Sequence, residues 1–217
     1  MDAALRARLA EIAGTPSVSG DSVSPSTAEQ VEQVCLACAE AGTRIAVTSS
    51  PAEGSAAPPG AVLVSLSGID PVDVDLDRLV VRAGAGASLA GVEQAAAKVG
   101  LAITGMAATT GDVRVGTAVA RGLVSRRALT GIEAVLPGGG RVAAGGAVLK
   151  DVAGYDLIGA LLGSEGRLAL VTAVTFRLQP AGVAAAQAAE PAGVPRGVLG
   201  DALEVAFDPQ RLLAARS

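Results

Sequence analysis

The 217-residue sequence contains no histidine and no tryptophan, and it has only one tyrosine and two phenylalanines. Half of its residues are nevertheless apolar, so we expect Ala, Val and Leu side chains to fill the core. No apolar run reaches the roughly 18 residues that a membrane-spanning helix needs. The N-terminal segment MDAALRARLAEIAG mixes acids with arginines and lacks the apolar segment of a secretion signal. The sequence therefore predicts a cytoplasmic protein without a membrane span.

Positive charge does not predominate, because the formal net charge is −4. This balance gives no electrostatic reason to expect binding to nucleic acid or to an anionic membrane. The acidic run Asp70–Asp77 superficially resembles a calcium loop, but it lacks the glycine and the distal glutamate of an EF-hand. We interpret it as a solvated connection, and we expect no metal site.

The cysteines Cys35 and Cys38 form a CxxC pair, which is typical of zinc sites and redox-active disulfides. A capping box, Ser26-Thr27-Ala28-Glu29, predicts a helix that runs to Gly42. Both cysteines then fall on its apolar stripe, and the chain has neither a histidine nor another cysteine pair to complete a zinc site. We interpret them as small core residues, with a redox role as the less favoured alternative.

The other elements of the first 145 residues follow from caps, glycine stops and hydrophobic periodicity. The 28 glycines are expected mostly in turns. The expected elements are helices at 3–13 and 88–98, a linker at 14–25, strands at 44–48, 61–66 and 79–83, and a hairpin of 132–136 with 141–144.

The most informative stretch is Gly145–Pro180, which reads GGAVLKDVAGYDLIGALLGSEGRLALVTAVTFRLQP. Asp156 is a plausible N-cap for a short apolar helix, and the turn Gly163–Gly166 follows that helix. From Leu168 to Leu178 the even positions are mostly apolar, and this period of two predicts a β-strand that ends at Pro180. A helix, a glycine turn and a long strand in this order indicate backbone that approaches a ligand closely.

This stretch also carries a family resemblance. K-D-V-A-G-Y-D-L, G-S-E-G and L-V-T-A-V-T-F-R-L-Q-P together resemble the end of the FAD-binding domain of the vanillyl-alcohol oxidase/PCMH flavoprotein family. Within it, the chain is most similar to the D-lactate dehydrogenase and glycolate oxidase flavin subunits, and V-R-A-G-A-G-A-S-L-A-G-V is similar to that family as well. The resemblance implies an α+β fold, namely a two-subdomain PCMH-type FAD-binding fold.

The resemblance also implies a division of the chain. Residues 1–22 would form an N-terminal helix and linker, and 23–180 the FAD-binding domain, with subdomains at about 23–85 and 86–180. Residues 181–217 would form a linker and a tail helix, because Leu199–Arg216 resembles the last helix and F-D-P tail of full-length members. A cap domain lies between these two pieces in the family, and here an Ala/Gly/Pro-rich linker replaces it, so we expect the cap domain to be absent.

Cofactor contacts are implied at three places in the resembling family: a pyrophosphate loop, a flavin-facing turn and the terminal strand. The loop is degenerate here, since V-T-S-S-P-A-E-G replaces its glycines, introduces a proline and adds a negative charge. The hydroxyls of this segment could partly substitute as donors. The implied FAD-binding residues are Thr48, Ser49, Ser50, Val115, Gly116, Thr117, Gly166 and Val171.

Function remains divided between three interpretations. The first is an FAD-binding subunit of an oxidoreductase that acts on a 2-hydroxy acid such as glycolate or D-lactate. The absence of histidine implies that FAD is bound non-covalently, and it leaves the catalytic base unidentified. A partner subunit would then complete the active site of a hetero-oligomer. This partner would be either another flavin subunit or an electron-transfer subunit. Lys150 and Tyr155 belong to the motif and are interpreted as structural. The second is a degenerate member that has lost FAD and serves in structure or assembly, and the third is an unrelated binding module.

Overall fold

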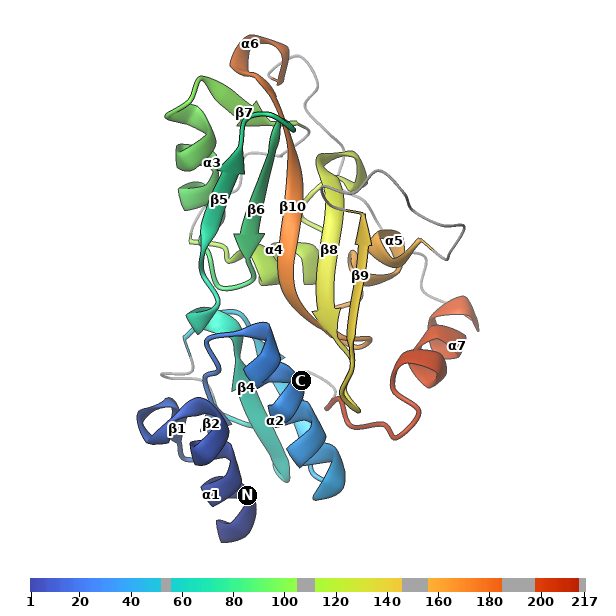
Figure 1. Ribbon diagram of the computed structural model, residues 1–217. Helices are drawn as coiled ribbons and strands as arrows, with labels where there is room; N and C mark the ends of the chain where they lie inside the picture. The colour runs from blue at the N-terminus through green and yellow to red at the C-terminus, as the bar shows by residue number, and fades with distance from the viewer. Residues whose placement is uncertain (52–55, 105–111, 146–155, 185–197, 215–217) are drawn as a thin grey trace.

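The computed structural model describes residues 1–51, 56–104, 112–145, 156–184 and 198–214. Two sheets lie one above the other, with the N-terminal sheet at the bottom of Figure 1 and the larger sheet at the top. The fold thus mixes helices and sheets in two parts. The K-D-V-A-G-Y motif, including Lys150 and Tyr155, lies outside the described residues.

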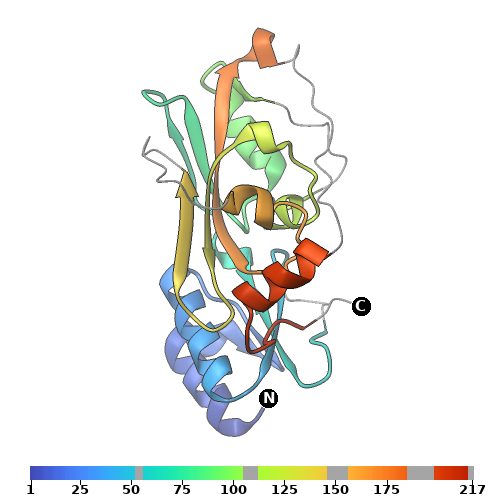
Figure 2. The ribbon, with the colours of Figure 1, turned by 90° about the vertical axis from the view of Figure 1, so that its right-hand side faces the viewer.

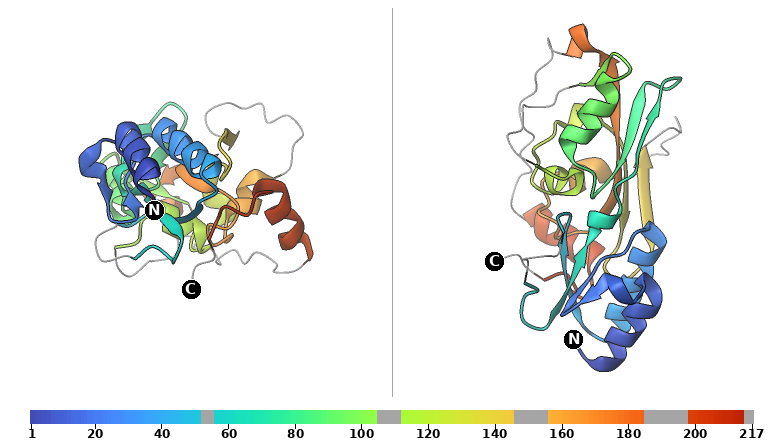
Figure 3. Two further views of the ribbon diagram at one scale, coloured as in Figure 1. Left: turned by 90° about the horizontal axis from the view of Figure 1, so that it is seen from below. Right: turned by 90° about the vertical axis from the view of Figure 1, so that its left-hand side faces the viewer.

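The N-terminal sheet has four strands in the order β1-β2-β4-β3. Its central part is parallel, because β4 pairs in parallel with both β2 and β3, whereas β1 and β2 form a short antiparallel hairpin. Two helices pack against it, and Figure 3 shows them side by side near the N-terminus. The elements are α1 (Ala3–Ala13), η1 (Thr15–Ser17), β1 (Val18–Ser19), β2 (Ser22–Val23), α2 (Ala28–Glu40), β3 (Arg44–Thr48), β4 (Ala61–Ser65) and η2 (Leu66–Gly68).

Helix α2 starts with a reciprocal cap that differs from the predicted one. Thr27 is the N-cap, and its hydroxyl accepts from Gln30 N at 3.2 Å, while Gln30 Oε1 accepts from Ser26 N at 2.8 Å. The box therefore uses Gln30 in place of the expected glutamate. Cys35 and Cys38 are fully buried and free in the core of this part, as the core interpretation predicted.

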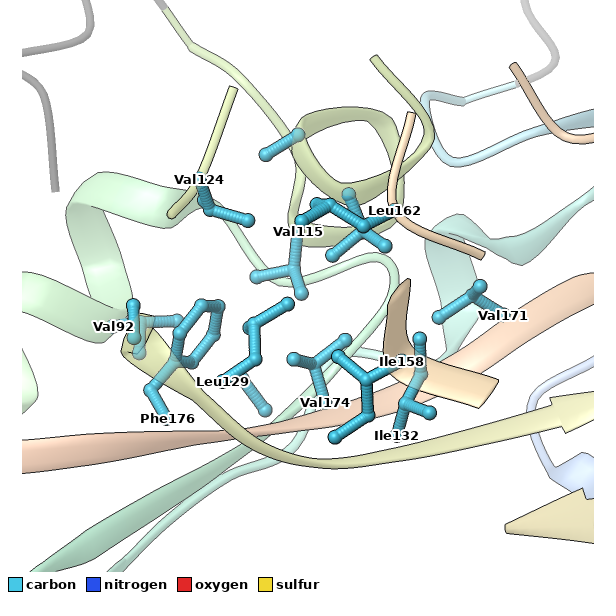
Figure 4. Packing of buried hydrophobic residues seen from close by; sticks show 14 of the residues in the cluster. Val92, Val115, Val124, Leu129, Ile132, Ile158, Leu162, Val171, Val174 and Phe176 are labelled. Atoms are coloured by element: carbon cyan, nitrogen blue, oxygen red, sulfur yellow. The ribbon is translucent and has the colours of Figure 1, made fainter. Parts of the chain in front are cut away.

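The larger sheet is antiparallel and has the order β5-β6-β10-β8-β9, with β7 paired to the end of β10. Figure 2 shows α3, α4 and α5 together on one face of this sheet. Figure 4 shows side chains of β8 and β10, among them Leu129 and Phe176, pointing toward those of the helices. The elements are β5 (Val72–Asp75), β6 (Val80–Gly84), α3 (Leu89–Ala97), β7 (Leu101–Ile103), α4 (Val115–Ala120), η3 (Arg126–Ala128), β8 (Leu129–Val135), β9 (Arg141–Gly145), α5 (Leu157–Leu161) and β10 (Leu170–Pro180).

Two sequence interpretations of connections were wrong. The acidic run Asp70–Asp77 contains edge strand β5, in which valines packed on the core alternate with aspartates. The linker at 14–25 contains the hairpin of β1 and β2, whose Val23 is fully buried. Because β5 and β6 pair within the larger sheet, residues 72–84 lie in that sheet, whereas we expected the first subdomain to reach about residue 85.

The C-terminal part was expected to contain a linker and a tail helix that is followed by the F-D-P segment. After β10 come α6 (Ala181–Ala184) and α7 (Val198–Phe207), and α7 ends at the phenylalanine of the F-D-P segment. The following residues turn at Asp208 and return to the N-terminal sheet, where Leu213 forms a parallel bridge with Ile45. Among the described residues, no helix combines the length and the apolar character needed to cross a bilayer.

Candidate functional site

The segment that follows β3 lies where the two sheets meet, and its conformation is held by hydroxyl groups. Thr48 and Ser49 are 8% and 6% exposed, whereas Ser50 is exposed. Thr48 Oγ1 accepts from Ser50 N at 3.2 Å, and Ser65 Oγ on β4 donates to Ser50 O at 2.8 Å. The expected Thr48–Ser50 segment is therefore an ordered turn in this structure.

Gly116 at the start of α4 lies directly against this turn. A Cβ atom added to Gly116 would lie 2.2 Å from Ser49 Oγ and 3.1 Å from the Ala85 Cβ, so only glycine leaves room for the contact. The backbone here is fixed as well, because Gly116 N donates to Ala85 O at 2.9 Å and Val115 N donates to Ala87 O at 2.9 Å. The structure thus brings together two of the segments that the sequence singled out.

The Gly163–Gly166 turn also lies where the two sheets meet. We call the meeting place of Thr48–Ser50, Gly116 and Gly166 the junction. Gly166 has a φ of 73°, and a Cβ there would lie 3.1 Å from the Val47 Cγ1 in β3. The turn is tied to α4 by Gly163 N, which donates to Val119 O at 2.8 Å, and by Glu165 N, which donates to Ala120 O at 2.7 Å. The ends of β3 and α4 and this glycine turn are therefore neighbours.

The remaining expected residues have different surroundings. Val171 is 7% exposed in β10, pairs with Ala134 of β8 and belongs to the hydrophobic core in Figure 4. Thr117 is half-buried in the first turn of α4, after the fully buried Val115. The structure thus brings Thr48, Ser49, Gly116 and Gly166 together and places the Val171 side chain in the core.

A family model described as an FAD binding domain matches residues 22–146, which is more than half of the chain. The chain belongs to the FAD-binding domain family. An FAD-linked oxidoreductase of Mycobacterium tuberculosis is 34% identical over 183 residues, which cover 78% of this chain and 40% of that relative. A D-lactate dehydrogenase of Archaeoglobus fulgidus is 35% identical over 131 residues, covering 55% of this chain and 29% of the relative. A glycolate oxidase subunit, GlcD of Bacillus subtilis, is 41% identical over 73 residues, covering 32% of this chain and 16% of the relative.

Solved structures agree on the fold, which is that of PCMH-type FAD-binding domains. A glucose dehydrogenase variant of Phl p 4 superposes with a TM-score of 0.61 at 21% identity, over 73% of this chain and 34% of that chain. Cholesterol oxidase from Brevibacterium sterolicum superposes with a TM-score of 0.59 at 18% identity, over the same shares. The chain spans at most about 40% of the length of the curated relatives named here.

FAD is the cofactor of this family, and the polar groups at the junction fit part of what FAD requires. The Ser49 hydroxyl has no hydrogen-bond partner within the described part of the chain, so it is available as a donor to a phosphate oxygen. Thr104, directly after β7, lies away from this junction, because its amide donates to Arg177 O near the far end of β10 at 3.3 Å; it is 5% exposed, and its buried Oγ1 has no partner within the described residues. A buried hydroxyl of this kind is costly unless water or another group satisfies it, and no sequence pattern indicated it.

Arg114 and Arg126 are both paired with carboxylates. Arg114, directly before α4, donates to Gly86 O at 3.1 Å and pairs with Asp112 at 2.9 Å. Arg126 in η3 pairs with Asp156 at 2.9 Å. The hydrogen bond from Arg126 also holds the pKa of the Asp156 carboxyl below its ordinary value. Arg126 therefore serves to anchor the start of α5.

The chain offers little chemistry of its own at this junction. Burial raises the pKa of the Cys38 thiol to about 11 and also raises that of Cys35, so both thiols are protonated at neutral pH. Within the described residues, no group of three or more His, Cys, Asp or Glu side chains could hold a metal ion. What the junction can do is bind and orient a group that brings its own reactivity.

Proposed function

We propose that this chain is the FAD-binding subunit of an oxidoreductase that acts on a 2-hydroxy acid such as glycolate or D-lactate, and that a partner subunit completes the active site. The observation that carries this proposal is the meeting of the Thr48–Ser50 turn, Gly116 and Gly166 at one junction. The similarity to proteins named D-lactate dehydrogenase and glycolate oxidase subunit supports the substrate class.

Bound FAD would supply the redox chemistry by accepting a hydride from the carbon that is oxidised. The role of this chain is then to hold it. Ser49 and the amides of the Thr48–Ser50 turn face the phosphates in this proposal, and Gly116 and Thr117 let the backbone of α4 approach the cofactor closely. Gly166 shapes the opposite wall, and the backbone of β10 near Val171 supports it. Binding is non-covalent in this proposal, because the chain has no histidine and both cysteines are buried in α2.

A partner subunit enters the proposal for a chemical reason. Oxidation of a hydroxy acid requires a base and a group that holds the carboxylate, in a pocket closed to water. The sequence has no histidine to serve as that base, and the chain spans about 40% of the relative that it matches over most of its length. We propose that another flavin subunit or an electron-transfer subunit supplies these groups.

A second function is favoured by one specific observation. The Ser49 side chain packs beside the Cα of Gly116. If residue 49 were glycine, this space would be open. In the alternative, the chain no longer binds FAD, the junction is packed like an ordinary core, and the protein serves as a structural or assembly subunit of a flavoenzyme. The two functions predict opposite results in a binding experiment.

The test is a titration of the purified chain with FAD, followed by the quenching of flavin fluorescence. The chain has no tryptophan, so protein emission does not overlap with the flavin signal. We expect saturable binding that weakens in Ser49→Ala, because a donor to the phosphates is lost. Thr130→Ala is the matched control, since it also removes one hydroxyl but lies on β8, where Thr130 Oγ1 donates to Thr175 O at 3.3 Å. Absence of saturable binding would refute the proposal and favour the assembly function.

The substrate is tested on the FAD-loaded chain under anaerobic conditions. Glycolate and D-lactate are added separately, with and without proteins that co-purify with the chain, and bleaching of the visible flavin band is recorded. We expect reduction in the complex and none with the isolated chain. Rapid reduction of the isolated chain would show that no partner is needed.

A further inference from the structure

The tail after α7 lies along the free edge of the N-terminal sheet. Strand β3 pairs with β4 on one side and is the last strand of that sheet. On its other side, Ile45 N donates to Leu212 O at 2.5 Å and Ala214 N donates to Ile45 O at 2.6 Å, in a parallel arrangement. Leu212 is 4% exposed, and Leu213 packs against the core of α1 and α2. The tail therefore adds one parallel β-bridge to the free edge of the sheet; Figure 2 shows the chain after α7 as a coil that runs down toward the N-terminal part.

A buried carboxylate builds the turn that directs the tail to β3. Asp208 is 6% exposed, and its two oxygens accept from Leu212 N and Leu213 N, each at 2.8 Å. Arg211 within this turn has a φ of 52°, which non-glycine residues adopt rarely and at a cost. Its amide donates to Asp208 O at 3.0 Å. Asp208 thus stabilises a turn in which the backbone conformation of Arg211 is unfavourable.

Helix α7, which precedes the tail, is anchored to the glycine turn. Glu204 in α7 forms an ion pair with Arg167 at 2.9 Å, and Arg167 directly follows Gly166. Gly166 in turn lies against Val47 of β3. Contacts therefore form a closed ring that runs from β3 through the tail and α7 to the glycine turn and back to β3. The ring includes Ile45 and Val47 of β3, the strand that ends at Thr48.

We propose that Asp208 is a positioning residue for the Thr48–Ser50 segment. This inference rests on the proposed binding of FAD at the junction. Asp208 acts through the tail, which is bridged to Ile45 on the second edge of β3, and β3 ends at Thr48. A strand that is hydrogen-bonded on both sides samples fewer conformations, so less entropy is lost when the turn becomes ordered around a ligand.

The proposal is tested with the full-length chain in three variants. Asp208→Ala removes both acceptors, and Asp208→Asn keeps one oxygen for one of the two amides. Asp2→Ala is the matched control: its carboxylate also accepts a backbone amide, that of Leu5 at 2.7 Å, but it caps α1 away from the junction. Each variant is titrated with FAD, and amide hydrogen exchange over residues 44–50 is measured without FAD.

We expect Asp208→Ala to raise the Kd for FAD about tenfold and to speed exchange over residues 44–50. Asp208→Asn should give a smaller change of the same sign, and Asp2→Ala should leave both readouts at the wild-type level despite a similar loss of thermal stability. Unchanged exchange at 44–50 in Asp208→Ala would overturn the inference, and so would an unchanged Kd. A wild-type chain that binds no FAD would instead overturn the proposed function, and with it the role of Asp208 toward FAD.

Discussion

The contact between Gly116 and Ser49 leads to a double-mutant cycle that tests the junction itself. Gly116→Ala places a methyl group 2.2 Å from Ser49 Oγ, 3.2 Å from the Ser49 Cβ and 3.1 Å from the Ala85 Cβ. Overpacking of this kind costs about 1–3 kcal/mol, while a glycine-to-alanine change in a helix returns at most about 1 kcal/mol. We therefore expect Gly116→Ala to lower the free energy of unfolding by about 1–2 kcal/mol.

Ser49→Ala removes the atom that makes the shortest contact. By itself this change should be nearly neutral, because the lost hydroxyl has no partner within the described residues. In the double variant the methyl group at 116 still meets the Cβ atoms of residues 49 and 85 at 3.2 and 3.1 Å, so relief is partial. A coupling energy of about 1 kcal/mol is expected between the two substitutions.

The assay is urea unfolding of the protein without added FAD, followed by far-UV circular dichroism at a fixed pH. Thermal unfolding gives a second readout, in which about 1 kcal/mol corresponds to a shift of roughly 2–4 °C for a chain of this size. Gly138→Ala is the control, because an added Cβ there meets nothing within 4 Å. Strictly additive effects of Gly116→Ala and Ser49→Ala would refute the contact on which the candidate site is built.

Two further predictions concern the larger sheet. Gly84→Ala should lower the free energy of unfolding by more than about 3 kcal/mol, because its Cβ would lie 2.2 Å from the Ile69 backbone oxygen, whereas Gly138→Ala should change it by less than about 0.5 kcal/mol in the same urea assay. Glu133→Gln should cost at most about 1 kcal/mol at pH 7, since the ion pair with Arg82 at 2.7 Å is about 40% exposed. The hydrogen bond from Arg82 lowers the pKa of Glu133. The ion pair should therefore contribute fully to the free energy of unfolding of the wild type above the ordinary pKa of 4.5, and this contribution should disappear as the pH falls below it. Comparable pH profiles of stability for the wild type and Glu133→Gln would contradict this.

Local signals in the sequence predicted most of the elements well. Asp156 caps α5 through Gly159 N, as its position before an apolar run indicated, and Ser88, the first residue of the helix expected at 88–98, caps α3 through Gly91 N. Strand β3 has the predicted bounds, and the hairpin of β8 and β9 turns at Gly139 and Gly140, both with φ near 90°. These features depend on neighbouring residues, so the sequence contains the information that determines them.

Contacts between distant segments could not be predicted from these local signals. The alternation of valine and aspartate in β5 fits an edge strand as well as a solvated loop until its pairing with β6 is known. The bridge between the tail and β3 depends on the Asp208 turn and on the free edge of β3, and the F-D-P segment alone does not indicate which strand the tail meets. The buried hydroxyl of Thr104 and the packing of Ser49 on Gly116 likewise arise from tertiary structure alone.

Ser49→Gly separates the two proposed functions by the sign of its effect. If the Ser49 hydroxyl donates to a phosphate of FAD, its removal leaves an unsatisfied acceptor and raises the Kd by about three- to tenfold. If the side chain instead fills the space that a glycine would leave beside Gly116, its removal reopens that space and FAD binds more tightly than to the wild type. Stability shifts equally in both cases, because glycine makes the same turn more flexible. Fluorescence titration of wild type, Ser49→Ala and Ser49→Gly with FAD distinguishes them: weaker binding in both variants refutes the loss of cofactor binding, and tighter binding in Ser49→Gly refutes a donor role for Ser49.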